Sequence, residues 1–248
     1  MGADDEQSVG VLTNMEVLSA RLLHDLAGSV GAMVSYVECL VEDPESEGTL
    51  HSLEEASEEI IARFRLLRQA YSSSEDNSSF DKTQSNIRQY LQKRGVAQLL
   101  WEVKAQFTDA ELVERVNRLL AHIALLSVML MVRGEEIAVS VVDTAEEGSV
   151  QLRVKLKADE VAMHRDIEQV LVYRDIDACK LNTRNIQAYF MSLLLVSVHS
   201  PGPTAAAFCV CTIVNSLFTA SNVHFKPVTI FSRAPQPSAY VGCMTVFE

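Results

Sequence analysis

Residues 20–40, ARLLHDLAGSVGAMVSYVECL, determine the architecture of the first third of the chain. Apolar side chains recur in this stretch every three or four residues, and such spacing is typical of an amphipathic helix. The same apolar stripe begins a little earlier in the sequence, and its members are Met15, Leu18, Leu22, Leu26, Val30, Met33, Val37 and Leu40. The pattern therefore predicts one long helix with a continuous apolar face.

A polar turn at residues 42–49, EDPESEGT, separates this helix from a second one. Pro44 and Gly48 interrupt the periodicity, and Thr49 is a suitable N-cap for the helix that follows. The second stripe has nearly heptad spacing and consists of Leu50, Leu53, Ser57, Ile60, Phe64, Leu67 and Tyr71. Two helices with a short connection form an antiparallel hairpin, which alone leaves much apolar surface exposed. We therefore expect a homodimer in which two hairpins form a four-helix bundle.

A polar, serine-rich stretch at residues 72–86 marks a domain boundary, and we divide the chain into residues 1–75 and residues 76–248. Residues 205–220 fit a helix or a buried strand, and their length and alanine content favour a helix. Further helices are expected at residues 87–93, 109–132, 159–173 and 182–198, and strands at residues 96–107, 137–143, 150–157, 226–232 and 239–247. This order predicts an α+β fold in which helices cover one face of a mixed or antiparallel sheet, as a two-layer α/β sandwich.

The composition narrows the possible partners and the compartment. The formal net charge is −12 at pH 7, and binding of nucleic acid or an anionic membrane surface needs clustered lysine and arginine instead. The acidic N-terminus does not resemble a signal peptide, and the longest apolar run, residues 123–132, is about half of a bilayer crossing. The five cysteines are scattered and odd in number, so we expect neither a disulfide framework nor a metal site, and a cytoplasmic protein.

His24 has unusually small neighbours for a histidine in a helix. At helical spacing it is surrounded by Ala20, Ala27, Gly28 and Gly31, although each glycine within a helix costs on the order of 1 kcal/mol relative to alanine. A core histidine would have larger neighbours, and a metal site would need a second ligand where these small residues stand. The imidazole lies about 200° around the helix from the apolar stripe, on the solvent side. Spacing alone leaves two alternatives, a reactive or docking histidine and a surface histidine without a role.

The helix around His24 resembles a known phosphoacceptor motif. RLLHDLAGSVGA, residues 21–32, is similar to the histidine-box helix of bacterial histidine phosphotransferases of the ChpT type, and also to the H-box of sensor histidine kinases. RGEEIAVSV at residues 133–141 and LNTRNIQAYFMSLLL at residues 181–195 resemble two further stretches of the phosphotransferase family. The resemblance covers most of the chain. Ser29 stands where the family usually has proline, and residues 199–224 have no counterpart in it.

The resemblance implies a phosphoryl carrier in a phosphorelay. A neutral imidazole is a competent nucleophile near pH 7 and forms a covalent phosphohistidine. The implied donor is the receiver domain of a hybrid histidine kinase, and the implied acceptors are response regulators of the CtrA type, which control the bacterial cell cycle. Mg²⁺ is expected in the receiver domain, and no cofactor or metal in this chain. The implied catalytic residues are His24 and Asp25, and the implied receiver-docking residues are Ala20, Arg21, Ala27, Gly28 and Gly31.

A helical hairpin followed by an α/β sandwich is also the plan of a sensor kinase. Its ATP site needs an Asp-x-Gly turn and a glycine-rich loop, and the glycines beyond residue 96 are isolated: Gly134, Gly148, Gly202 and Gly242. Asn117 stands on the helix that would carry a Mg²⁺ ligand, but a lone asparagine is more often solvated. We therefore expect a degenerate ATP-binding fold and a phosphotransferase, not an ATP-dependent kinase. The alternative function is a dimeric scaffold that docks receiver domains without carrying phosphate.

Overall fold

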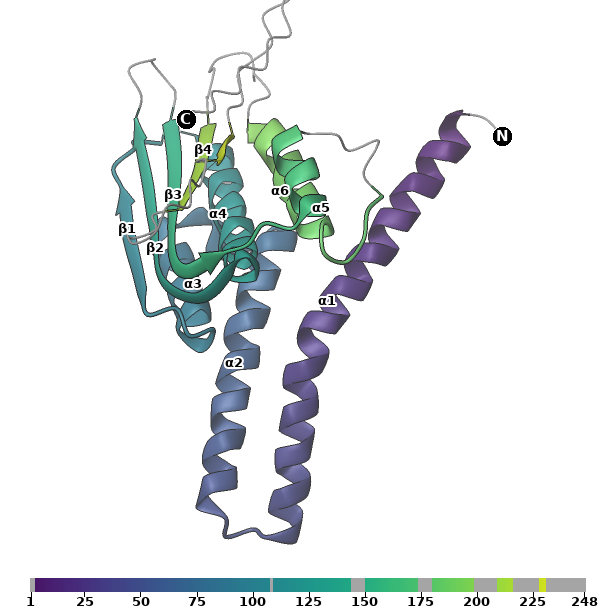
Figure 1. The fold of residues 1–248 in the computed structure, drawn as a ribbon, viewed down its shortest axis with the longest axis vertical. Coiled ribbons are helices and arrows are strands. Elements are labelled where there is room, and N and C mark those ends of the chain that lie inside the picture. Colours follow the sequence, from purple (N-terminus) through teal and green to yellow (C-terminus); the bar gives the residue numbers. More distant parts are fainter. Residues whose placement is uncertain are drawn as a thin grey trace, which may run out of the picture.

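Two long antiparallel helices dominate the shape of the molecule (Figure 1). They are α1 (Ala3–Glu42) and α2 (Glu47–Tyr71), and they confirm the predicted hairpin. The turn differs from the prediction because Ser46, not Thr49, stands at the N-cap position of α2, and the two hydroxyl groups lie 2.9 Å apart. The computed structural model describes residues 3–107, 109–143, 150–173, 180–198, 209–215 and 228–230.

Hydrogen bonds order the serine-rich stretch after the hairpin. It contains a short 3-10 helix, η1 (Glu75–Ser78), and the first turns of α3 (Phe80–Lys93), so this helix begins earlier than the predicted residue 87. The Asn77 side chain is fully buried and donates to the backbone oxygens of Gln69 and Ser72 at 3.2 and 3.3 Å. These bonds hold the segment against the end of α2. The division of the chain at residue 75 stays a prediction.

Within the described ranges, a five-stranded mixed sheet follows the sequence order β1-β2-β3-β4-β5. The pairs β1–β2 and β3–β4 are parallel, and the pairs β2–β3 and β4–β5 are antiparallel. The strands are β1 (Gln98–Val103), β2 (Met131–Asp143), β3 (Val150–Val161), β4 (Cys209–Asn215) and β5 (Val228–Ile230). Parallel neighbours need a crossover connection, which a helix supplies between β1 and β2.

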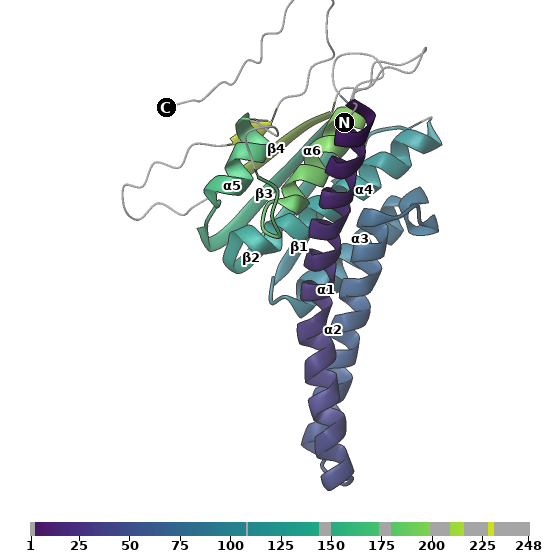
Figure 2. The same ribbon diagram turned by 90° about the vertical axis from the view of Figure 1, so that its right-hand side faces the viewer.

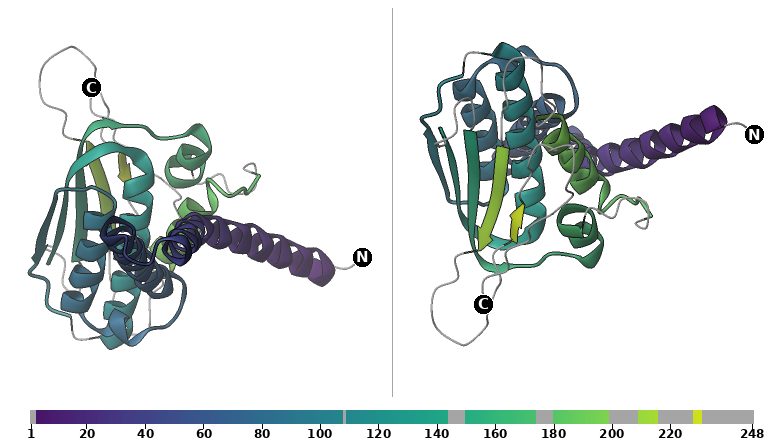
Figure 3. Two further views of the ribbon diagram at one scale, coloured as in Figure 1. Left: turned by 90° about the horizontal axis from the view of Figure 1, so that it is seen from below. Right: turned by 90° about the horizontal axis from the view of Figure 1, so that it is seen from above.

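That crossover helix is α4 (Ala110–Leu130), and α3, α4 and α6 lie on the same side of the sheet (Figure 3). The predicted α+β class and two-layer sandwich are thus confirmed. The connection from β3 to β4 includes α5 (Arg165–Glu168), the π-helical turn η2 (Gln169–Tyr173) and α6 (Ile186–Val198). Asn182 and Asn185 cap α6 reciprocally, since each amide oxygen accepts from the backbone N–H of the other, at 3.2 and 2.8 Å.

Two further predicted elements differ from the structure. The helix expected at residues 205–220 is wrong for the described part, because Cys209–Asn215 pairs in parallel with β3 as strand β4. Pairing with β3 and the β-branched residues of this segment favour a strand more strongly than the alanine content of residues 205–220 favours a helix. The helix expected from residue 159 begins at Arg165, because β3 continues to Val161. The strand expected at residues 239–247 lies outside the described residues.

The end of α2 belongs to the core of the sandwich. Leu66, Leu67 and Ala70 of α2 are buried in the same apolar cluster as the helices and strands of the sheet layer. In Figure 2, α1 runs alongside α2 and then passes in front of α6. Asn14 of α1 donates to the Tyr189 hydroxyl of α6 at 3.5 Å. The base of the hairpin is therefore packed against the sandwich, while its far end extends from it. None of the helices in the described ranges has an apolar stretch that could cross a membrane.

His122 joins α2, α4 and α6 where the hairpin meets the sandwich. Its Nε2 lies 2.8 Å from the Ala70 oxygen, and its Nδ1 lies 2.7 Å from Nε2 of Gln187. The Tyr71 hydroxyl donates to Oε1 of Gln187, and the Tyr71 ring meets the imidazole edge-on at 4.8 Å. Burial lowers the pKa of His122 to about 4. The imidazole is therefore neutral, with Nε2–H donating to Ala70 and Nδ1 accepting from Gln187.

Acid is expected to weaken the fold through His122. The unfolded chain takes up a proton near pH 6.5 and the folded chain only near pH 4, so stability falls as the pH drops through this window. Urea unfolding at fixed protomer concentration measures this effect. Between pH 7.5 and pH 5, the free energy of unfolding should fall by about 2 kcal/mol less in His122→Gln than in the wild type. His51→Gln, which removes an exposed histidine, is the control. Equal losses in the wild type and His122→Gln would contradict the prediction.

Candidate functional site

The structure places His24 on the open side of α1, midway along the helix. Its side chain is 82% exposed, and the small residues predicted around it are exposed as well: Ala20, Ala27, Gly28 and Gly31. Ser29, at the position where the resembled family has proline, is buried, and α1 continues through it without interruption. The predicted small-residue face is therefore a real surface feature, and the imidazole stands free in the middle of it.

The packing of the chain does not explain the two glycines on this face. A Cβ atom built on Gly28 or on Gly31 would meet no atom within 4 Å beyond its chain neighbours and the backbone of its own helix turns, so alanine would fit at both positions. Since glycine costs stability inside a helix, the reason for keeping it must lie outside the described packing. A bare helix face lets another macromolecule bring its backbone close to His24.

Asp25 is held from two sides beside His24. Its Oδ2 accepts from Nε of Arg21 at 2.8 Å, and its backbone oxygen accepts from Nη1 of Arg63 on α2. The other carboxylate oxygen, Oδ1, lies 3.7 Å from Nδ1 of His24. This separation is longer than a hydrogen bond but within ion-pair reach. Asp25 therefore faces the Nδ1 side of the imidazole and leaves Nε2 for reaction.

Arg21 differs from the other predicted docking residues because its guanidinium turns toward the sandwich. Its side chain is only 18% exposed. Besides the bond from Nε to Asp25, Nη1 donates to the backbone oxygen of Thr183 and Nη2 donates to Sδ of Met129, both at 3.2 Å. Met129 belongs to α4, and Thr183 lies just before α6. Arg21 thus bridges the histidine turn of α1 and the sandwich. Its docking role stays a prediction.

Arg63 also belongs to this site, although its position in the sequence gives no sign of it. Its helical spacing shows only an i,i+4 pair with Glu59, at 3.4 Å. The contact with Asp25 depends on how α1 packs against α2, and no local pattern in the sequence indicates that register.

A wide apolar face lies beside His24, about 100° around α1. Large apolar side chains on it are between about half and three-quarters exposed, and contiguous exposed apolar side chains of this kind mark an interaction surface. Those on α1 are Leu23, Val30, Val34, Val37 and Val41, and those on α2 are Leu50, Ile61 and Phe64. We refer to these eight residues as the hairpin apolar face.

Asn117, the residue in the position of a kinase metal ligand, has a structural role instead. It is fully buried, and its Nδ2 donates to the backbone oxygen of Asn77 at 2.8 Å. The expectation of a solvated asparagine was therefore wrong. The bond connects α4 with the backbone of η1.

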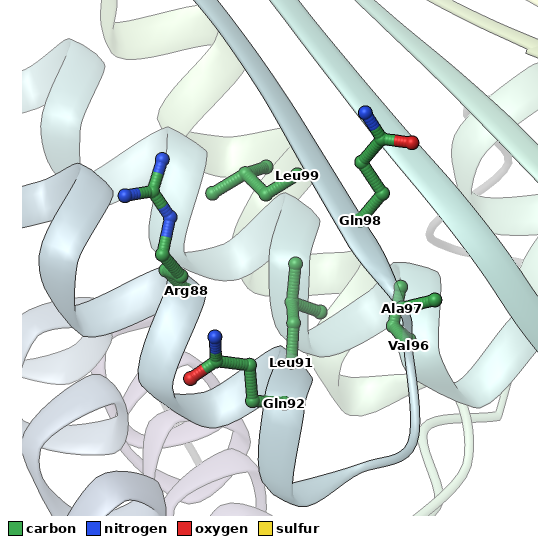
Figure 4. A pocket seen from close by; sticks show the side chains of 7 residues that line it. All are labelled: Arg88, Leu91, Gln92, Val96, Ala97, Gln98 and Leu99. Carbon is green, nitrogen blue, oxygen red and sulfur yellow. The ribbon is translucent and has the colours of Figure 1, made fainter.

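Two hollows lie away from His24. One, between α3 and β1, has a volume of about 230 Å³ and is drawn in Figure 4, where Arg88 and Gln92 extend from α3 and Leu99 from β1. It is smaller than usual small-molecule sites. The other, of about 580 Å³, lies where Arg94, Arg133, Glu135 and Asp159 mix both signs of charge. Among the described residues, no group of three or more His, Cys, Asp or Glu side chains could hold a metal ion.

Comparisons with known proteins agree with the fold. Residues 80–200 match the family model described as the histidine phosphotransferase C-terminal domain. A solved structure described as a bacterial phosphotransferase at 1.7 Å is similar, with a TM-score of 0.63 and 17% identity, over 75% of this chain and 87% of that one. At this identity the structural similarity shows the fold alone. No curated protein matches the sequence. The resemblance to histidine phosphotransferases is confirmed.

Replacing either glycine of the small-residue face should stabilise the protein. Gly28→Ala and Gly31→Ala are each expected to raise the free energy of unfolding by about 0.5–1 kcal/mol, because alanine is the better helix former and meets nothing. Urea unfolding at fixed protomer concentration measures the effect. Gly134→Ala is the control and should not raise the free energy of unfolding, since its Cβ would lie 3.0 Å from side-chain atoms of Met131 and Val96. A loss of stability in both helix variants would show that the face is packed.

Proposed function

We infer from the match of residues 80–200 to the family model of the histidine phosphotransferase C-terminal domain that the chain is a phosphoryl carrier of the ChpT type. It acts in a phosphorelay, and we propose His24 as the residue that carries the phosphoryl group. The observation that carries this assignment is an imidazole that is 82% exposed, stands on a face of alanine and glycine, and has a held carboxylate at its Nδ1 side.

The proposed reaction moves a phosphoryl group from an aspartyl phosphate to an imidazole. Nε2 of His24 attacks the phosphorus atom, the bond between phosphorus and the aspartyl oxygen breaks, and its electron pair returns to the receiver carboxylate. The proton on Nδ1 stays in place, and the ring gains positive charge. Asp25, with Oδ1 3.7 Å from Nδ1, stabilises that charge. The reverse step transfers the group to a second receiver.

Positioning supplies most of the rate in such a transfer, because the protein has little covalent chemistry to perform. Ala20, Ala27, Gly28 and Gly31 leave room for the loops of a receiver domain around His24. Mg²⁺ bound by the receiver neutralises charge on the phosphoryl oxygens. The proposed donors and acceptors are the receivers of a hybrid histidine kinase and of CtrA-type response regulators in the bacterial cytoplasm.

A homodimer is part of the proposal. The hairpin apolar face carries enough exposed leucine, valine, isoleucine and phenylalanine for a four-helix bundle of two hairpins. It lies beside His24 and not over it, so a bundle would leave both histidines open. We also propose that the chain does not use ATP, because its glycines lack the phosphate-loop pattern and Asn117 is fully buried against η1.

Phosphotransfer assays test the carrier function. Radiolabelled phosphoreceiver with Mg²⁺ should transfer label to the wild type and to His51→Gln, an exposed-histidine control on α2, but not to His24→Gln. The labelled product should be acid-labile and base-stable, as phosphohistidine is, and ATP alone should give none. Receiver binding without label in any variant would establish the scaffold alternative, and label in His24→Gln would place the phosphoryl group elsewhere.

The dimer is tested by charging its proposed centre. Phe64→Glu should convert the dimer to a monomer in light scattering coupled to gel filtration, because a carboxylate would be buried without a partner. Leu100→Glu, which changes a similarly exposed apolar residue on β1, should leave the mass unchanged. A wild type that is already monomeric at micromolar concentration would refute the bundle.

A further inference from the structure

The contacts of Arg21 point to a role beyond docking. Three groups surround its guanidinium: the Asp25 carboxylate, the Thr183 oxygen and Sδ of Met129, at 2.8, 3.2 and 3.2 Å. A guanidinium presents its donors in a rigid plane, so contacts on two sides determine its orientation. The Asp25 carboxylate bonded to it is oriented as well.

The two oxygens of Asp25 are divided between two partners. Arg21 binds Oδ2, and Oδ1 is the oxygen that lies 3.7 Å from Nδ1 of His24. Arg63 binds the backbone oxygen of Asp25 and so holds the main chain of the same residue. With both ends held, the carboxylate cannot rotate freely, and Oδ1 keeps facing the imidazole.

We propose that Arg21 is a positioning residue for phosphoryl transfer, acting through Asp25 on His24. This inference rests on the proposed carrier function. Arg21 orients the carboxylate, the carboxylate selects the tautomer with the proton on Nδ1, and that tautomer presents the lone pair of Nε2 to the phosphorus atom. During transfer the proton remains on Nδ1, and the same carboxylate stabilises the positive charge.

The bridge also connects the reaction with the sandwich. Thr183 and Met129 lie within the residues that match the phosphotransferase family, while Asp25 and His24 lie before them. Arg21 is thus a direct polar contact from the histidine turn to the matched domain. The position of the sandwich against α1 therefore sets the orientation of Asp25.

A double-mutant cycle separates this role from a structural one. Single-turnover transfer from a phosphorylated receiver is measured for Arg21→Gln, Asp25→Asn, the double variant and Arg153→Gln, an exposed arginine on β3, as control. Each of the first two variants should slow transfer by about 10-fold to 100-fold. If Arg21 acts through Asp25, the double variant is no slower than Asp25→Asn. A double variant whose loss of rate is the product of the two single losses would overturn the proposal, and so would a wild-type rate in Arg21→Gln.

Nitrogen-15 NMR of the His24 ring gives a readout that does not need transfer. In the wild type the neutral ring should be mostly the Nδ1–H tautomer, and Arg21→Gln should lower this fraction toward the value in Asp25→Asn, while Arg153→Gln leaves it unchanged. An unchanged tautomer in Arg21→Gln refutes the inference. A wild type that takes no phosphoryl group refutes the proposed function, and the tautomer measurement still decides the role of Arg21.

Discussion

The buried imidazole of His122 is the interaction on which the arrangement of the molecule depends. Its two nitrogens face the end of α2 at Ala70 and the start of α6 at Gln187, so a single neutral side chain of α4 joins three helices. Around this junction the last turn of α2 enters the core of the sandwich. Because α1 pairs with α2, its middle is brought beside α4 and α6. Only in that position can Arg21, which binds Asp25 on its own helix, also reach Thr183 and Met129.

His122 and His24 show how the surroundings of an imidazole set its chemistry. His122 lies in an apolar helix, is almost fully buried, and has a pKa lowered to about 4 by desolvation. His24 stands 82% exposed on a face without large side chains. The first cannot take a charge in the folded protein near neutral pH, and it serves as a connector. The second can reach an external group, and a carboxylate lies ready for the charge that a phosphoryl group would create.

Periodicity in the sequence predicted the hairpin and the exposure of His24, because each depends on local spacing along one element, and the order of helices and strands predicted the sandwich. It could not predict the direction of Arg21, which depends on where α4 and the start of α6 lie against α1. Arg63 was missed for the same reason, since helix register brings it to the Asp25 oxygen. The burial of Asn117 could not be predicted either, because its hydrogen-bond partner, the backbone oxygen of Asn77, is distant in the sequence. The composition of residues 205–220 wrongly predicted a helix around β4, because pairing with β3 determines the conformation of this strand.

The same contacts bear on how a phosphoryl group could reach His24. If the sandwich itself delivered the phosphoryl group, it would have to move against α1. Here the end of α2 is buried in the core of the sandwich, η1 is held by Asn77 and Asn117, and Arg21 bridges the sandwich and the histidine turn. Moving the sandwich would break a buried network whose polar groups have few alternative partners. A sandwich held in this way favours delivery of the phosphoryl group from outside the chain, onto the one side of α1 that the small residues leave open.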